Sequence, residues 1–482
     1  MRQDVVLLLL GLVSGLNTVP FAVVQGLQAQ TTVRHVDCDN AHQVINDTIR
    51  DWYEIGFTEF EEIPARSGKW TLIFESIASL ANVASGGADL MEFMVTLKRI
   101  EQAVAPSNVT VQQVMHIWQS EWSSLAEAVE ADGQEYFDSG DAASAASAYL
   151  RAWNYYMTAE RLSNHLAQSS LKLYNSSLSC FEQALNLTNS PCQLVQIPYS
   201  EQGSAYSLHG YMCEANSQEA AKGTILLMTG YDGTAELLLH SVGLEAVHRG
   251  YNVLAFEGPG QGSVSRFQGL HFRPDWEVVV SQVVEWLLHT YSEAFNEQSF
   301  ILWGRSFGGY LAPKAFAANQ RRYSVLIADG GMYDFYQVAL CSLPESLRDL
   351  WYQDRDSFSN KLSSLQNYSL SLKSFLAFGE LGFGSSEPKD IYLSAQSFWL
   401  EKNISGINAR PVLVNDPALD SIAGNQSMIF YSQLPRPLSN HTEVLNLNPK
   451  RGAGLHCGVG SNSYTLNAEI SWLDSVMKEI EI

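Results

Sequence analysis

The five residues Gly304-Arg305-Ser306-Phe307-Gly308 form the pattern in this sequence that points most directly to chemistry. An apolar run, Phe300 to Trp303, precedes them, and the helix-like segment GYLAPKAFAANQ follows. A G-x-S-x-G pattern between a strand and a helix is typical of a sharp turn that presents a nucleophilic serine at the carboxyl edge of a sheet. The flanking glycines leave room for close backbone packing. We therefore predict that Ser306 is a nucleophile.

A serine hydroxyl needs a general base, and behind such a turn the chain order is serine, acid, histidine. Two histidines, His441 and His456, lie beyond the last predicted strand, Pro411 to Val414. His441 lies inside a glycosylation sequon, which is typical of a surface position. His456 lies in the glycine-rich loop Gly452 to Gly458, which can deliver an imidazole to the sheet edge. We predict His456 as the base, with a structural histidine as the alternative.

The acid that orients the imidazole should follow the same last strand. Asp416 and Asp420 both lie there. We favour Asp420 because it is further along the loop, nearer the place where His456 must arrive. Asp416 is the second candidate, and Asp329 at the end of the preceding strand is the third.

Stabilising the charge that develops on a carbonyl oxygen requires two backbone N–H groups. The predicted donors are Phe307, which follows the nucleophile, and Tyr231 in the loop Gly230 to Thr234. Asp232 in that loop could orient it or a polar group of the substrate, or could simply form a turn. Asp334 is a further candidate for a loop or substrate contact.

Beyond about residue 195, apolar runs of strand length alternate with helical segments such as Glu236 to Arg249 and Trp276 to His289. The predicted strands are Thr224 to Thr229, Asn252 to Phe256, Phe300 to Trp303, Ser324 to Ala328 and Pro411 to Val414. This alternation predicts a mostly parallel sheet with helices on both faces. With the serine turn, it predicts an α/β-hydrolase fold for residues 191–482, with a helical insertion at about 332–405.

Residues 30–190 lack strand-like runs and are predicted to be helical. The stretch Gly133 to Leu162 reads as two helices joined by a turn at Ser139 to Asp141, similar to one tetratricopeptide unit. One unit cannot bury its apolar face alone, so we predict a cap packed on another domain. Cap and insertion together are expected to roof the sheet edge and close a pocket.

Residues 1–29 resemble a secretory signal peptide, because the apolar run Val5 to Leu16 is shorter than a membrane span. A retained membrane anchor is the alternative. Eight Asn-X-Ser/Thr sequons also favour the secretory pathway. They lie at Asn46, Asn108, Asn175, Asn186, Asn367, Asn403, Asn425 and Asn440. We predict a secreted or lumenal protein with no stable membrane span after cleavage.

The formal net charge of -22 argues against nucleic acid as a partner and favours an uncharged or cationic small molecule. No CxxC pair or Cys/His cluster predicts a metal, and no cofactor is expected. Of the six cysteines, Cys180 and Cys192 would close the shortest loop and are the first choice for a disulfide. A homodimer is left open.

Several segments occur together in a characteristic order: GYDGTAELL, YNVLAFEGPGQG, FRPDWEVVV, GRSFGGYLAPKAFA and HCGVG. With SGDAASAASAYLRAWNYYMTAERL, they resemble the α/β-hydrolase group of FrsA-like and 2,6-dihydroxypseudooxynicotine hydrolase-like proteins, which includes fungal polyketide-pathway hydrolases. The resemblance covers roughly residues 115–480. It implies an N-terminal helical cap, no cofactor, and a triad that falls here on Ser306, Asp420 and His456.

These observations and the resemblance predict acyl transfer at the carbonyl of an ester, a lactone or a 1,3-diketone. The expected substrate is a small, polyketide-derived metabolite. Two alternatives stay open. The same triad could serve cyclisation or acyl transfer to an internal nucleophile, because a closed cap excludes water. A non-catalytic binding protein on the same fold is the third hypothesis.

Overall fold

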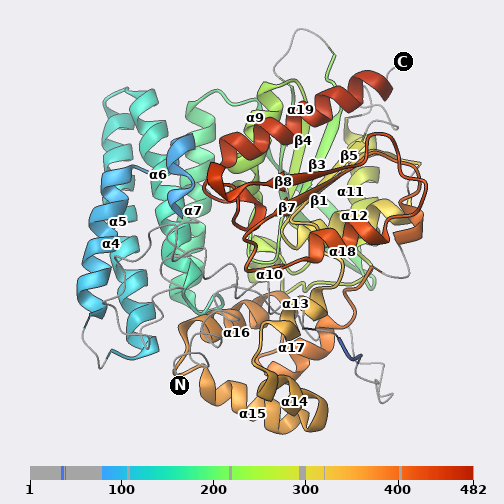
Figure 1. Ribbon diagram of the computed structural model, residues 1–482. Helices are drawn as coiled ribbons and strands as arrows, with labels where there is room; N and C mark the ends of the chain where they lie inside the picture. Colours follow the sequence, from blue (N-terminus) through green and yellow to red (C-terminus); the bar gives the residue numbers. More distant parts are fainter. Residues whose placement is uncertain are drawn as a thin grey trace.

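The computed structural model describes residues 34–36, 38, 79–105, 109–215, 220–291, 300–319, 321–400 and 404–480. In this part of the chain, a central sheet is flanked by helices on both faces, with a helical bundle at one side and a helical insertion at one end (Figure 1). The predicted signal peptide and the sequons at Asn46, Asn108 and Asn403 lie outside the described residues. None of the described helices is long and apolar enough to cross a membrane.

The sheet has eight strands in the order β1-β2-β4-β3-β5-β6-β7-β8 within the described residues. Their bounds are β1 Cys192–Glu201, β2 Ser204–Cys213, β3 Thr224–Met228, β4 Asn252–Phe256, β5 Phe300–Arg305, β6 Tyr323–Asp329, β7 Val412–Pro417 and β8 Glu443–Leu447. The strands from β3 to β8 run parallel to their neighbours, whereas β1 and β2 form an antiparallel hairpin and β2 pairs antiparallel with β4. The α/β-hydrolase fold and all five predicted strands are confirmed.

The sheet separates two apolar cores because successive strand residues point to opposite faces. In β3, Leu226 and Met228 pack into the core that includes the insertion, whereas Ile225 and Leu227 pack into the core that includes the N-terminal helices. Strands covered on both faces read as unbroken apolar runs, which made β3 to β7 visible in the sequence. β1 alternates between buried and exposed residues, and β8 is largely uncovered.

The N-terminal bundle consists of α4 (Leu90–Val104), α5 (Val111–Asp138), α6 (Ala142–Arg161) and α7 (Gln168–Leu187). Thr110 and Gln113 form a capping box at the start of α5, and the Asp141 carboxylate accepts from the Ser144 N–H at the start of α6. Helix α6 packs against both α5 and α7, and most of its residues are buried. The bundle shares a core with the sheet, as a cap packed on a second domain would.

The insertion between β6 and β7 comprises α13 (Phe335–Cys341), α14 (Glu345–Gln353), α15 (Arg355–Leu365), α16 (Leu370–Phe383) and α17 (Pro388–Ala395). The remaining elements flank the sheet. They are α8 (Ala235–Leu238), a π-helical turn (Leu239–Gly243), α9 (Leu244–His248), α10 (Gly262–Gln268), α11 (Trp276–Thr290), α12 (Gly308–Ala318), α18 (Gln426–Gln433) and α19 (Asn462–Ile480). The predicted helix Glu236 to Arg249 is thus interrupted by the π-helical turn.

The predicted disulfide between Cys180 and Cys192 is wrong. Cys192 instead bonds to Cys213, which lies directly opposite it in the β1–β2 hairpin with a Cα–Cα distance of 4.0 Å. Cys180 is a free, buried thiol on α7, beside Glu130 of α5. A second disulfide joins Cys38 to Cys341 of the insertion. Strand pairing, and not separation along the chain, decides which sulfurs meet.

Candidate active site

The turn between β5 and α12 places Ser306 at the carboxyl edge of the sheet, in a left-handed conformation with φ of 61°. A Cβ on Gly304 would lie 1.8 Å from the carbonyl oxygen of Gly308, and one on Gly308 would lie 2.2 Å from that of Met228. Both positions therefore require glycine. The Ser306 N–H donates to the Asp329 carbonyl oxygen at 2.8 Å, which fixes the turn to the neighbouring strand.

The structure brings Ser306, His456 and Asp420 into one chain of hydrogen bonds. The Ser306 Oγ lies 2.9 Å from His456 Nε2, and His456 Nδ1 lies 2.8 Å from Asp420 Oδ2. With Nδ1 protonated, the imidazole donates to Asp420 and accepts from the serine hydroxyl. The other Asp420 oxygen accepts from the N–H groups of Ile422 and Ala423, both at 2.9 Å, so the carboxylate is held on both sides.

The two other carboxylates considered for the acid lie elsewhere. Asp416 ends β7 without a hydrogen bond to His456, and burial and the nearby Asp420 carboxylate raise its pKa. Asp329 accepts from Asn415 Nδ2 at 2.8 Å and lies 3.3 Å from Arg305 Nε. Among the three candidates, only Asp420 contacts the imidazole.

The electrostatics of His456 reflect two opposing causes. Burial lowers the pKa of this imidazole, but the adjacent Asp420 carboxylate raises it, and the net direction is well above the ordinary value. A carboxylate in this position therefore favours the charged form of the imidazole.

Behind the histidine lies a buried polar network that the sequence did not reveal. Arg305 Nη2 donates to the Cys457 carbonyl oxygen at 2.8 Å and so holds the loop that carries His456. The Asn415 side-chain amide donates to both Asp329 and Glu469. Burial and the neighbouring Asp329 carboxylate raise the pKa of Glu469 well above its usual value, which lets a second acid lie here without a second negative charge.

The loop Gly230 to Thr234 lies directly against the serine. A Cβ on Gly230 would lie 3.1 Å from Ser306 Oγ. Gln261 Nε2 supports this loop by donating to the carbonyl oxygens of Thr229 at 2.7 Å and Gly230 at 3.1 Å. Phe307 precedes the first turn of α12, where N–H groups lack partners within the helix. Tyr231 and Phe307 are thus both in elements that flank Ser306.

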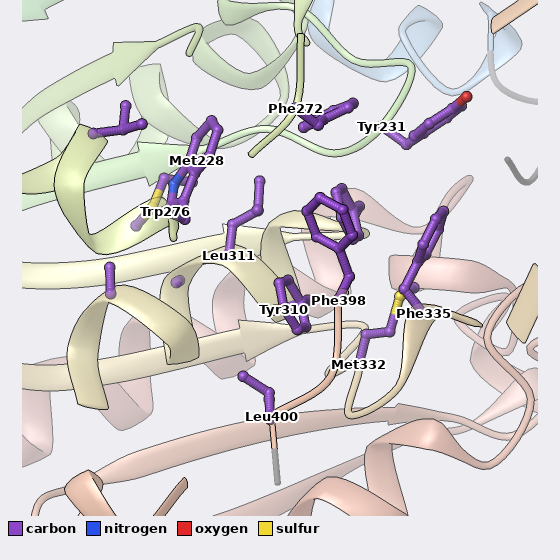
Figure 2. Close-up of a cluster of buried hydrophobic side chains, with 14 of the residues drawn as sticks. Met228, Tyr231, Phe272, Trp276, Tyr310, Leu311, Met332, Phe335, Phe398 and Leu400 are labelled. Atoms are coloured by element: carbon purple, nitrogen blue, oxygen red, sulfur yellow. The ribbon is translucent and has the colours of Figure 1, made fainter. Parts of the chain in front are cut away.

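The side chains of these two residues belong to one buried aromatic cluster. Figure 2 shows the rings of Tyr231, Phe272, Phe335 and Phe398 gathered together. The Phe307 ring contacts this cluster, with a centroid distance of 4.5 Å to Phe335. The aromatic residues of the insertion therefore build a core that supports the sheet edge.

The two further aspartates have different surroundings. Asp232 lines a cavity next to Ser306 and forms an ion pair with Arg161 at the end of α6, which ties the N-terminal bundle to the loop. Asp334 does not line the cavity. It caps α13 and binds Arg34 through both carboxylate oxygens, so the structure gives it a contact between chain segments.

The cavity at Ser306 has a volume of about 140 Å³. Its walls come from the N-terminal bundle, the loop after β3, α8 with the π-helical turn, and the loops that carry Asp420 and His456. The lining residues are Ala81, Asn82, Arg161, Thr229, Gly230, Tyr231, Asp232, Gly233, Leu237, Leu238, Ser241, Arg305, Ser306, Ile422, His456, Cys457, Val459 and Asn462. No described residue of the insertion lies among them. The prediction that the insertion helps the N-terminal cap to cover this cavity is therefore wrong. In the described residues no group of three or more metal-binding side chains occurs.

The fold and its serine-centred edge define the chain as an α/β hydrolase, and known proteins agree. Residues 242–376 match the model of the prolyl oligopeptidase family. The chain is similar to Hydrolase acrC of Aspergillus aculeatus, with 27% identity over 429 residues that cover 83% of this chain and 95% of the relative. It is also similar to 20-hydroxy-prefusarin hydrolase FUS2 of Gibberella moniliformis, with 26% identity over 421 residues and the same two coverages.

Among solved structures, 2,6-dihydroxy-pseudo-oxynicotine hydrolase is similar over 83% of this chain and 95% of its own, with a TM-score of 0.55 and 18% identity. This likeness supports the fold. The resemblance stated from the sequence segments is confirmed: the chain is an α/β hydrolase enzyme related to fungal hydrolases.

Proposed function

We propose that this chain is a serine hydrolase that acts on a carbonyl group of an uncharged small metabolite. It would break the C–O bond of an ester or a lactone, or a C–C bond of a 1,3-diketone. The observation that carries the proposal is the hydrogen-bonded chain Ser306–His456–Asp420 at the wall of a cavity. Ser306 Oγ attacks the carbonyl carbon, and His456 Nε2 takes the hydroxyl proton. Asp420 holds the imidazole and stabilises its charged form.

Collapse of the tetrahedral intermediate expels an alcohol or, from a diketone, an enolate carbon. His456 gives this leaving group the proton that it took from Ser306. The N–H groups of Phe307 and Tyr231 stabilise the oxyanion in this scheme. A water molecule, deprotonated by His456, then attacks the acyl carbon. The bond from this carbon to Ser306 Oγ breaks, the serine takes the proton back from His456, and a carboxylic acid leaves.

The proposed substrate class rests on the net charge of the protein, the volume of the cavity and the similarity to fungal hydrolases. A net charge of -22 disfavours anionic substrates, and a cavity of about 140 Å³ at Ser306 favours a slender small molecule over a bulky one. The resemblance to fungal polyketide-pathway hydrolases supports a polyketide-derived metabolite, and the relative FUS2 is itself named for 20-hydroxy-prefusarin.

A substrate panel tests this proposal. We expect kcat/KM to be highest for aromatic polyketide esters or 1,3-diketones, lower for simple acyl esters, and negligible for a long triglyceride or a peptide. Steady-state kinetics with product analysis by mass spectrometry measures this order and distinguishes a hydrolysed product from a cyclised one. Clear preference for the triglyceride or the peptide would contradict the proposed substrate class.

We also propose that the protein is secreted and glycosylated. The mature chain is expected to begin near residues 27–30 and to carry N-linked glycans. Of the described sequons, Asn175, Asn186, Asn367 and Asn440 have an exposed asparagine, whereas Asn425 is half-buried. The first four are therefore the expected acceptors and Asn425 should stay unmodified.

Intact-mass measurement and glycopeptide mapping of secreted protein, before and after endoglycosidase, check these expectations. An unglycosylated protein that retains Met1 would refute them. Occupancy at Asn425 equal to that at the exposed sites would refute the assignment of acceptor sites alone.

A further inference from the structure

The cavity at Ser306 is small for the substrates proposed above. Pockets for drug-sized ligands usually span ~300–1,000 Å³, whereas this one has about 140 Å³. The cavity alone holds the reacting carbonyl and its nearest atoms. The rest of a metabolite must lie elsewhere on the protein.

A second hollow adjoins the cavity and is larger, with a volume of about 520 Å³. Ala81, Ser241 and Asn462 line both spaces, so the two share a wall. We call the second hollow the outer groove. Its lining residues are Ala81, Ala84, Ser85, Leu150, His240, Ser241, Leu244, Glu245, Asn462, Ser463, Leu466 and Asn467. Cavity and outer groove together reach the size range of a drug-sized ligand.

The π-helical turn between α8 and α9 forms the border between the two spaces. Leu238 lines the cavity, His240 and Leu244 line the outer groove, and Ser241 lines both. A π-helical turn inserts an extra residue into a helix and often occurs at functional sites. Here it lets one short helical segment line both spaces.

The walls of the outer groove are mixed in polarity and carry little net charge. Leu150, Leu244 and Leu466 are apolar, and serine and asparagine side chains lie between them. Burial lowers the pKa of His240 to about 4, so this imidazole is neutral at neutral pH. The carboxylate of Glu245 accepts from Arg249 Nε at 2.7 Å, which offsets its charge.

We propose that the outer groove binds the uncharged, partly oxygenated tail of an extended carbonyl substrate whose reacting carbon lies at Ser306. The leucines would contact the hydrocarbon part of such a tail, and the serine and asparagine groups would bind its hydroxyl or keto oxygens. This inference rests on the proposed hydrolase function and adds the shape and charge of its substrate.

Chain-length selectivity tests the proposal. The probes are 4-nitrophenyl acetate, butanoate and octanoate, with methyl, butyl and octyl acetates as a second series that places the tail on the alcohol side. In the wild-type protein, kcat/KM is expected to rise with length in at least one series, because each buried methylene adds favourable transfer free energy. The 4-nitrophenyl monoester of octanedioic acid, with a charged end, should lose that gain.

Ala84→Trp fills the outer groove from the N-terminal side, and Asn467→Trp fills it from α19. Either change should lower the ratio of kcat/KM between the long and the short ester about tenfold or more, since several methylenes lose their contacts. Ala131→Trp, at an exposed position of α5 outside the groove, is the matched control and should keep the wild-type ratio. Melting temperatures verify that each variant is folded.

Flat length profiles in both wild-type series, or unchanged ratios in both groove variants, would overturn the proposal. Failure of the hydrolase function itself is distinguishable, because it would appear as activity that survives Ser306→Ala whatever the length of the ester.

Discussion

Ser306→Ala is expected to lower kcat by roughly 10⁴–10⁶-fold while the protein folds and is produced as the wild type is. The variant removes the hydroxyl oxygen that forms the acyl-enzyme in the proposed mechanism, and it leaves the cavity and the loop of His456 in place. Turnover of a 4-nitrophenyl ester measures the loss, with active-site concentration in the wild type determined by a fluorophosphonate probe. The residual rate should come from charge stabilisation and binding alone.

The same probe separates an enzyme from a binding protein on a hydrolase fold. Wild-type protein should label covalently at Ser306, and the alanine variant should not. Equal melting temperatures of the wild type and the alanine variant serve as the control for folding. Retention of more than about a tenth of the wild-type turnover would show that Ser306 is not the nucleophile.

Asp420→Asn should lower kcat by roughly 10⁴-fold, because an amide in place of the carboxylate favours the wrong imidazole tautomer. It should also move the acid limb of the pH profile to lower pH. The Asp420 carboxylate raises the pKa of His456, so its removal lowers the pH at which the imidazole loses its proton. A purely structural role for Asp420 would reduce activity without this shift.

Asp416→Asn is the matched comparison, since it removes a carboxylate that lies four residues before Asp420, near the end of β7. Asp416 has no hydrogen bond to His456, and burial raises its own pKa, so the loss of activity should be far smaller. Profiles of kcat/KM against pH for the two variants and the wild type make the comparison. A larger loss for Asp416→Asn would mean that the acid has been misassigned.

Local chemistry made part of this protein readable from its sequence. The strands β3 to β7 are covered on both faces, so their unbroken apolar runs predicted a parallel sheet. Gly304 and Gly308 are glycine because backbone oxygens lie where a Cβ would go, and that constraint leaves its mark as a motif. The chain order of serine, acid and histidine follows from the order of the strands in the sheet.

Edge strands gave a weaker signal. β1 and β8 lie at the two edges of the sheet, so each is only partly covered and has no continuous apolar run. The disulfides escaped prediction for a related reason. Cys192 meets Cys213 by strand register, and Cys341 meets Cys38 from 303 residues away.

What only the tertiary structure decided is which groups meet around Ser306. Position along the chain favoured Asp420 over Asp416 but did not settle the choice, and the structure shows that the loop after β7 turns Asp420 toward His456. Arg305 and Gln261 support the site through side-chain hydrogen bonds to backbone oxygens, which no sequence pattern encodes. The cavity likewise takes its walls from the N-terminal bundle and not from the insertion, because a pocket is defined by surfaces that converge from distant parts of the chain.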